Sequence, residues 1–202
     1  MTASEQSRPA RSSGPDTTDP EYLREVTIGE PQVLTERIVV ADYDPQWPKI
    51  FERLATDIRG VLGDTVVSLE HIGSTSVPGL AAKPIIDIQL VVADPDREAG
   101  YVPALETLGY LLRIREPQWH RHRVLKHTEP ATNLHVFGPG AEPVHRDLMF
   151  RDRLRDHDTD RDHYARVKRE LAQRDWTYMQ QYADAKTEVV TEILHRAGYR
   201  EP

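Results

Sequence analysis

The sequence predicts a mixed α/β fold whose C-terminal third is helical. Two apolar runs, 66–72 and 84–92, have the length and composition of strands, and the second is uniform enough to be central in a sheet. After Pro143 the apolar residues instead recur at the spacing of helices. We therefore expect an α/β core with flanking helices, followed by helices that pack on it.

The N-terminal segment differs in composition from the rest of the chain. Residues 1–18 are rich in Ser, Thr, Pro, Arg and Gly and have almost nothing to bury, so disorder is expected there. Residues 19–36 leave open a short helix or an arm laid on the core. The first strand is expected at Ile38–Val40. We expect one domain in three segments: a tail or arm at 1–36, a core at 37–142 and C-terminal helices at 143–202.

One amphipathic helix is expected in the N-terminal half. Asp44 can cap its start, and Pro45 fits the first turn, where a missing N–H costs nothing. Apolar residues from Trp47 to Leu62 then recur at helical spacing, and Gly63 ends the pattern. The remaining expected elements are a helix at 97–108, strands at 110–114, 121–127 and 133–137, and helices at 144–157, 160–174 and 178–197.

Composition excludes several classes of function. The 202 residues contain no cysteine, so disulfides, thiolate catalysis and zinc–thiolate sites are excluded, and the cytoplasm is the expected compartment. No apolar run reaches the length of a membrane span, so we expect no membrane partner. The formal charge is −7, and basic and aromatic residues are not interleaved on any segment. Nucleic acid is therefore not an expected partner.

The stretch HIGSTSVPGLAAKPIIDIQLVV, residues 71–92, contains the residues best suited to chemistry. Gly73 lets backbone N–H groups approach an anion, and Ser74 adds a hydroxyl donor where a short helix is expected to start. Asp87 lies inside an apolar strand, where a carboxylate is costly unless it binds a metal or finds donors. A phosphate loop that faces a metal-binding acid is the minimum for phosphoryl or nucleotidyl transfer. The same pattern also occurs in proteins without such chemistry, so both interpretations stay open.

The full motif resembles the signature of the GrpB family. The resemblance continues in NLHVFGPG (133–140), LMFRDRLRDH (148–157), YARVKRELAQR (164–174) and YADAKTEVV (182–190), and it spans about 37–197. It implies a nucleotidyltransferase-like mixed sheet with flanking helices. Members of the family occur alone or fused to dephospho-CoA kinase.

The wider superfamily pattern implies a metal site that this chain matches only in part. The pattern has a Gly-Ser turn, two acids two residues apart on the next strand, and a third acid on a later strand. Gly73, Ser74 and Asp87 match it, whereas Gln89 and His135 occupy the positions of the other acids. Asp87, Gln89 and His135 could still hold one Mg²⁺ or Mn²⁺ ion, with lower affinity because only one donor is charged. Asp87 and His135 are the implied catalytic residues.

Five further residues are candidates for substrate contacts, each with a structural alternative. Lys83 and Lys186 could contact nucleotide phosphates, or they could be solvated surface lysines. His71 should share the side of Gly73 and could bind phosphate or support the loop. Arg123, in a basic hairpin, could steer an anionic substrate or lie on the solvated outer face of an edge hairpin. Arg151 lies in the family-like segment that follows the His135 strand, and it is expected either to contact substrate or to support the residues that do.

Two functions from different classes remain. The first is a metal-dependent transferase that moves a nucleotidyl group from ATP or another nucleoside triphosphate to a small-molecule acceptor. The second is a catalytically degenerate module that binds a nucleotide or a protein partner, with a link to CoA metabolism. Gln89 and His135 favour the second function, whereas retention of Ser74, Asp87 and His135 together favours the first.

Overall fold

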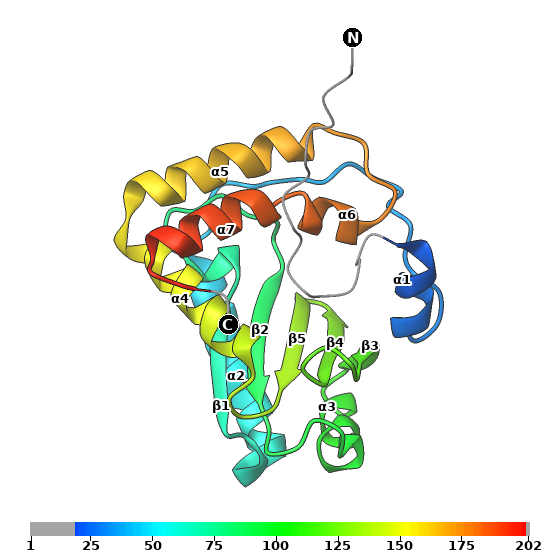
Figure 1. Ribbon diagram of the computed structural model, residues 1–202. Coiled ribbons are helices and arrows are strands. Elements are labelled where there is room, and N and C mark those ends of the chain that lie inside the picture. Colours follow the sequence, from blue (N-terminus) through cyan, green and yellow to red (C-terminus); the bar gives the residue numbers. More distant parts are fainter. Residues whose placement is uncertain (1–18, 201–202) are drawn as a thin grey trace.

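The computed structural model describes residues 19–200 and contains a five-stranded mixed sheet (Figure 1). The strands are β1 (Ser68–Ile72), β2 (Ile86–Val91), β3 (Leu111–Glu116), β4 (His122–Thr128) and β5 (Ala131–Phe137). They lie in the order β1-β2-β5-β4-β3, and β2 and β5 are parallel while the other neighbours are antiparallel. The apolar strand β2 is thus inside the sheet, as its composition predicts. The tail for which disorder was predicted lies outside the described residues.

Alternation along β2 gives the sheet an apolar and a polar face. The apolar face packs against two helices, α2 (Gln46–Leu62) and α3 (Val102–Glu106). The β2 residues in this main core are Ile86, Ile88 and Leu90. Because successive strand residues point to opposite sides, Asp87 and Gln89 belong to the other face. The core that stabilises the sheet therefore also orients the candidate carboxylate.

The C-terminal helices pack around the loop that joins β1 to β2. They are α4 (Glu142–Asp156), α5 (Asp158–Ala172), α6 (Met179–Asp184) and α7 (Thr187–Arg196). In Figure 1, α5 and α7 lie beside each other above the sheet, and α4 runs along the β1 side. A second hydrophobic cluster joins Val77 and Leu80 of the loop to Leu154, Tyr164 and Ile193 of these helices. The loop is consequently held between the sheet and the C-terminal helices.

The single helix expected over 178–197 is two helices, α6 and α7, separated by a turn at Ala185 and Lys186. The apolar residues of these two helices pack in two different hydrophobic clusters. Tyr182 packs with Leu171, whereas Ile193 packs with the loop cluster. The turn lets the chain change direction between these clusters, which one straight helix would not do. It also makes Lys186 the residue before the first turn of α7.

The segment before residue 37 contains a helix, and the expected strand at Ile38–Val40 is wrong. Helix α1 (Pro20–Val26) is followed by Ile28, whose N–H donates to the carbonyl of Arg113 on β3 at 2.8 Å. Ile38 and Val40 instead pack against Leu171 and Tyr182. The β pairing nearby is an isolated bridge between Ala41 and Ala82. The apolar character of Ile38 and Val40 reflects helix contacts and not a sheet, whereas Val39 between them is exposed.

Two helix boundaries also differ from expectation. Helix α2 begins one residue later than predicted, although the Asp44 carboxylate still accepts a hydrogen bond from the Gln46 N–H at 2.8 Å. The helix expected over 97–108 is a short 3-10 turn followed by α3. The 3-10 turns are η1 (Gly63–Thr65), η2 (Ser74–Ser76) and η3 (Glu98–Gly100). Within residues 19–200, no helix has the length and apolarity needed to span a membrane.

Candidate functional site

Gly73 brings the turn after β1 against the Asp87 carboxylate. Ile72, the last residue of β1, pairs with Asp87, so the turn starts beside this side chain. Gly73 has φ +67° and ψ −173°, a conformation that is essentially restricted to glycine. A Cβ at this position would overlap Oδ2 of Asp87 and lie 3.0 Å from its Cβ. Glycine is therefore required both by its backbone conformation and by close packing on Asp87.

Ser74 is held by a buried lysine that the sequence analysis missed. Nζ of Lys168, on α5, lies 2.8 Å from Oγ of Ser74 and 2.6 Å from the carbonyl oxygen of Ala81. Lys168 is 3% exposed. Burial, followed by the nearby charge of Lys186, lowers its pKa to about 6. The signal that could have found Lys168 was its place in the family-like segment 164–174.

Asp87 is half-buried and remains ionised because of its neighbours. Burial alone would raise the pKa of this carboxyl, but the imidazole of His135 and the amide of Asn133 favour its charged form and hold the pKa below its ordinary value. Nδ2 of Asn133 donates to Oδ1 of Asp87 at 2.8 Å, and Nε2 of His135 lies 3.9 Å from the same oxygen. The parallel pairing of β2 with β5 places all three side chains on the polar face.

Four lysines surround this single carboxylate. Lys83, Lys126, Lys168 and Lys186 each interact electrostatically with Asp87. Burial and the charge of Lys186 lower the pKa of Lys83 to about 8. Burial likewise lowers the pKa of Lys126, with a further contribution from Arg113. One carboxylate does not balance the charge that these lysines carry when they are protonated, so the region is suited to an anion.

The predicted metal ligands are not assembled into a complete metal site. Gln89 is 1% exposed, and neither polar atom of its amide has a hydrogen-bond partner within residues 19–200. It therefore hydrogen bonds with neither Asp87 nor His135. Across the described residues, no three His, Asp or Glu side chains converge as a metal site of their own. Asp87 is the one carboxylate of the predicted trio, so a divalent ion would need further oxygen ligands from a bound phosphate.

His71 supports the loop from the apolar side of the sheet and does not share the side that was predicted. His71 pairs with Ile88 of β2, so both side chains point to the apolar face. Its ring stacks on that of Phe51 of α2, with 4.6 Å between the ring centroids. Its Nε2 lies 3.1 Å from Oγ1 of Thr75, whose hydroxyl donates to the carbonyl of Ile85. Burial lowers the pKa of His71 to about 4. These contacts are those of a residue that fixes the loop.

Arg123 lies on the apolar face, away from the Asp87 carboxylate. It pairs with Val136 across the strands, is 4% exposed, and donates to Glu98 at 2.7 Å and to Asp96 at 2.9 Å. Its cross-strand partner Arg115 also donates to Glu98, so this face of the hairpin is occupied by ion pairs. The donors of Arg123 are thus engaged far from the site where a substrate contact was expected.

Two arginines of α4 hold the carbonyl groups of the loop. Nη1 of Arg151 lies 3.1 Å from the carbonyl oxygen of His71 and 2.9 Å from Oε2 of Glu70. Arg155, which sequence reasoning did not select, donates to the carbonyl oxygen of Ser76 at 2.8 Å. Arg151 therefore stabilises the end of β1 just before the turn. Because Nη1 is already engaged there, fewer of its N–H groups are available for the predicted substrate contact.

A five-stranded mixed sheet flanked by helices, with a helical C-terminal third, defines an α+β protein, and its glycine-serine turn faces an acid among several lysines. A family profile described as GrpB protein matches residues 37–196, and the chain belongs to this family.

Three comparisons illustrate this membership. The UPF0157 protein BH1888 of Halalkalibacterium halodurans is 56% identical over 88% of this chain and 91% of its own. The crystal structure of the conserved protein GrpB from Enterococcus faecalis superposes with a TM-score of 0.67 at 30% identity, over 80% of this chain and 100% of that chain. A dephospho-CoA kinase of Mycolicibacterium paratuberculosis is 30% identical over 65% of this chain but only 39% of its own length. The predicted family and fold class are confirmed.

Proposed function

We propose that the polar face around Asp87 binds a nucleoside triphosphate and transfers its nucleotidyl group to a small-molecule acceptor. The observation that carries the proposal is the set of four lysines around one carboxylate, next to the glycine-serine turn. Keeping several cations near one another costs free energy unless an anion offsets their repulsion. A triphosphate supplies such an anion, and the loop supplies N–H groups and the Ser74 hydroxyl to bind it.

The proposal gives individual residues the following roles. Ser74 and Lys168 would bind the phosphates that follow the α-phosphate, with Lys83 and Lys186 completing the positive surface. An acceptor oxygen or nitrogen would attack the α-phosphorus, the bond to the leaving pyrophosphate oxygen would break, and the acceptor's proton would pass to water. Asp87 packs against the turn, so the reacting α-phosphate would lie near its carboxylate.

A divalent ion fits this site as part of a metal–nucleotide complex. Mg²⁺ is commonly bound by one or two carboxylates together with substrate phosphates. Asp87 would provide the carboxylate, and the ion would neutralise charge on the phosphates. The orphaned amide of Gln89 could provide an oxygen after a local rearrangement.

A catalytically degenerate binding module is the second candidate. The observation in its favour is the replacement of two expected acids by Gln89 and His135, which leaves one negative donor. The match to part of a dephospho-CoA kinase is compatible with a domain that binds a nucleotide beside another enzyme. Nucleotide binding without turnover, for every acceptor tested, would favour this candidate.

Calorimetry with a non-hydrolysable ATP analogue tests the proposal, because Asp87→Asn should change affinity in opposite directions with and without metal. Without metal, removal of a negative charge should tighten binding of the triphosphate to the lysines. With Mg²⁺ or Mn²⁺, loss of the carboxylate should weaken binding, and by more than Gln89→Ala does. Ser74→Ala should cost about 0.5–1.5 kcal/mol, or up to about 3 kcal/mol if the hydroxyl contacts a charged oxygen. Wild-type protein that binds no triphosphate would refute the proposal.

A further inference from the structure

Two cations, Lys126 and Arg113, lie beyond Asp87 as seen from the glycine-serine turn. The chain enters this turn from β1, on one side of β2, whereas Lys126 and Arg113 belong to β4 and β3 on the other side. Asp87 pairs with Asn133, and Asn133 pairs with Lys126, so these three residues form one row across β2, β5 and β4. Asp87 is therefore between the turn and the two cations.

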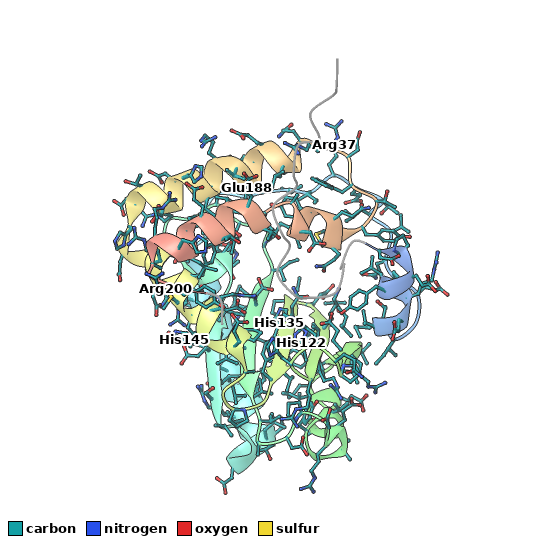
Figure 2. The ribbon with its side chains drawn as sticks, viewed as in Figure 1. Arg37, His122, His135, His145, Glu188 and Arg200 are labelled. Carbon is teal, nitrogen blue, oxygen red and sulfur yellow. The ribbon has the colours of Figure 1, made fainter. Side chains whose placement is uncertain are left out.

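The polar face continues from β5 onto β4 and β3. Figure 2 shows His135 and His122 next to each other, and their ring centroids are 5.3 Å apart. Residues an even number of positions apart on a strand share a face, so Lys126 is on the same face as His122. Arg113 is the extra residue of a β-bulge between Leu112 and Ile114, and its charge acts on Lys126.

Lys126 and Arg113 differ from the other cations of the hairpin because they form no ion pair. The other three arginines of the hairpin each bind an acid of the segment 94–98 at 2.6 to 3.0 Å: Arg115, Arg121 and Arg123. Within residues 19–200, the side chains of Lys126 and Arg113 have neither a hydrogen bond nor a carboxylate partner. The proposed contacts of the triphosphate, which involve Lys83, Lys168 and Lys186, also leave these two residues free.

Two neighbouring cations without an acid favour a bound anion. Burial, and next the charge of Arg113, lower the pKa of Lys126, so the protonated amine is disfavoured until an anion offsets the repulsion. Leu111 pairs with Lys126 on the same face, and 49% of its surface is exposed. An exposed apolar side chain beside two cations suits a molecule that has both an anionic group and an apolar part.

We propose that Lys126 and Arg113 bind a phosphate group of the acceptor molecule, whose body contacts Leu111 and extends toward Asp87. This assignment rests on the proposed function, because it places the molecule that receives the nucleotidyl group on this side of Asp87. A phosphate dianion matches two cations, whereas a carboxylate matches one. Strand β4 lies two strand spacings, about 10 Å, from β2. The acceptor therefore has its nucleophilic hydroxyl or amine several bonds away from its phosphate.

An NMR titration of the full-length protein with phenyl phosphate tests this subsite without any nucleotide. Near pH 8 this probe is largely a dianion, because the second pKa of a phosphate monoester is about 6. The amide signals of residues 111–114 and 124–128 should shift and saturate. Benzoate, a carboxylate with the same ring, should bind more weakly. Equal binding of benzoate would overturn the assignment to phosphate, and shifts confined to the glycine-serine turn would overturn the subsite.

Variants with one cation fewer test the two residues separately. Lys126→Met and Arg113→Met, at positions open to solvent, should each weaken binding of phenyl phosphate about tenfold or more. Lys126→Arg keeps the charge and should retain most of the affinity. Arg115→Met is the matched control, because Arg115 is on the same strand as Arg113 but is bound to Glu98. A similar loss in Arg115→Met would mean that only net charge matters, and it would overturn the proposal.

A non-hydrolysable ATP analogue distinguishes failure of the subsite from failure of the proposed function. Phenyl phosphate should still shift the β3 and β4 signals when the analogue is bound, because the two anions occupy different sides of Asp87. Displacement of phenyl phosphate by the analogue would overturn the acceptor assignment. Triphosphate binding without any phenyl phosphate binding would overturn the subsite alone. Phenyl phosphate binding that depends on Lys126 and Arg113, in a protein that binds no triphosphate, would support the anion subsite and refute the proposed function.

Discussion

Triphosphate binding should be accompanied by proton uptake, because the lysines at the site are partly neutral before an anion arrives. Burial lowers the pKa of Lys168 to about 6 and that of Lys83 to about 8. At pH 8, about 99% of Lys168 and about half of Lys83 are then unprotonated. If the bound triphosphate restores both to their charged forms, uptake is about 1.5 protons per site.

Calorimetry in buffers with different ionisation enthalpies measures this number directly. The slope of the apparent binding enthalpy against the buffer enthalpy equals the number of protons taken up. The terminal phosphates of tripolyphosphate and of an ATP analogue also titrate near pH 8, so the ligand's own proton exchange is measured on the double variant Lys83→Met/Lys168→Met and subtracted. Lys168→Met should reduce uptake to about 0.5 and Lys83→Met to about 1, whereas Lys49→Met, at an exposed position on α2, should leave it unchanged. Measurable binding without proton uptake would refute the assignment of these lysines to the phosphates.

Three further predictions concern the scaffold. Gly73→Ala should destabilise the protein by about 1–3 kcal/mol in urea unfolding and displace Asp87, whereas Gly60→Ala, in open space on α2, should stabilise it slightly. Ile58→Ala should cost about 2–5 kcal/mol, and Leu54→Ala should cost less because Leu54 is only partly buried. The free energy of unfolding should fall as pH is lowered from 9 to 7, because unfolded Lys168 binds a proton that the folded protein excludes; Lys168→Met should flatten this slope.

Much of the fold could be predicted from local pattern. The strand expected at 84–92 is β2, and the helix that ends at Gly63 is α2, because a buried strand and an amphipathic helix have distinct periodicities. The expectation failed at Ile38–Val40, where three apolar residues are compatible with either a strand or a contact with helices. The sequence also predicted one helix over 178–197 where there are two. The spacing of apolar residues there does not indicate that the two halves of the segment pack on different clusters.

Some residues of the candidate site could likewise be predicted from the sequence, and others could not. Gly73, Ser74 and Asp87 were selected because each is unusual in its local context, as a flexible turn, a hydroxyl at a helix start and an acid in an apolar strand. His135 was selected through the superfamily pattern. By contrast, Arg123 was expected at the site and lies on the other face, because one residue of register decides which way a strand side chain points.

The sequence by itself therefore determined the family, the α/β class and the turn that faces Asp87, since these depend on residues close together in the chain. The tertiary structure decided which distant side chains reach that turn. Lys168 arrives from α5, and Arg151 and Arg155 arrive from α4. Their roles depend on burial and on hydrogen-bond partners far away in sequence. Only the packed arrangement of sheet and helices determines these, because local pattern does not specify the distance between segments.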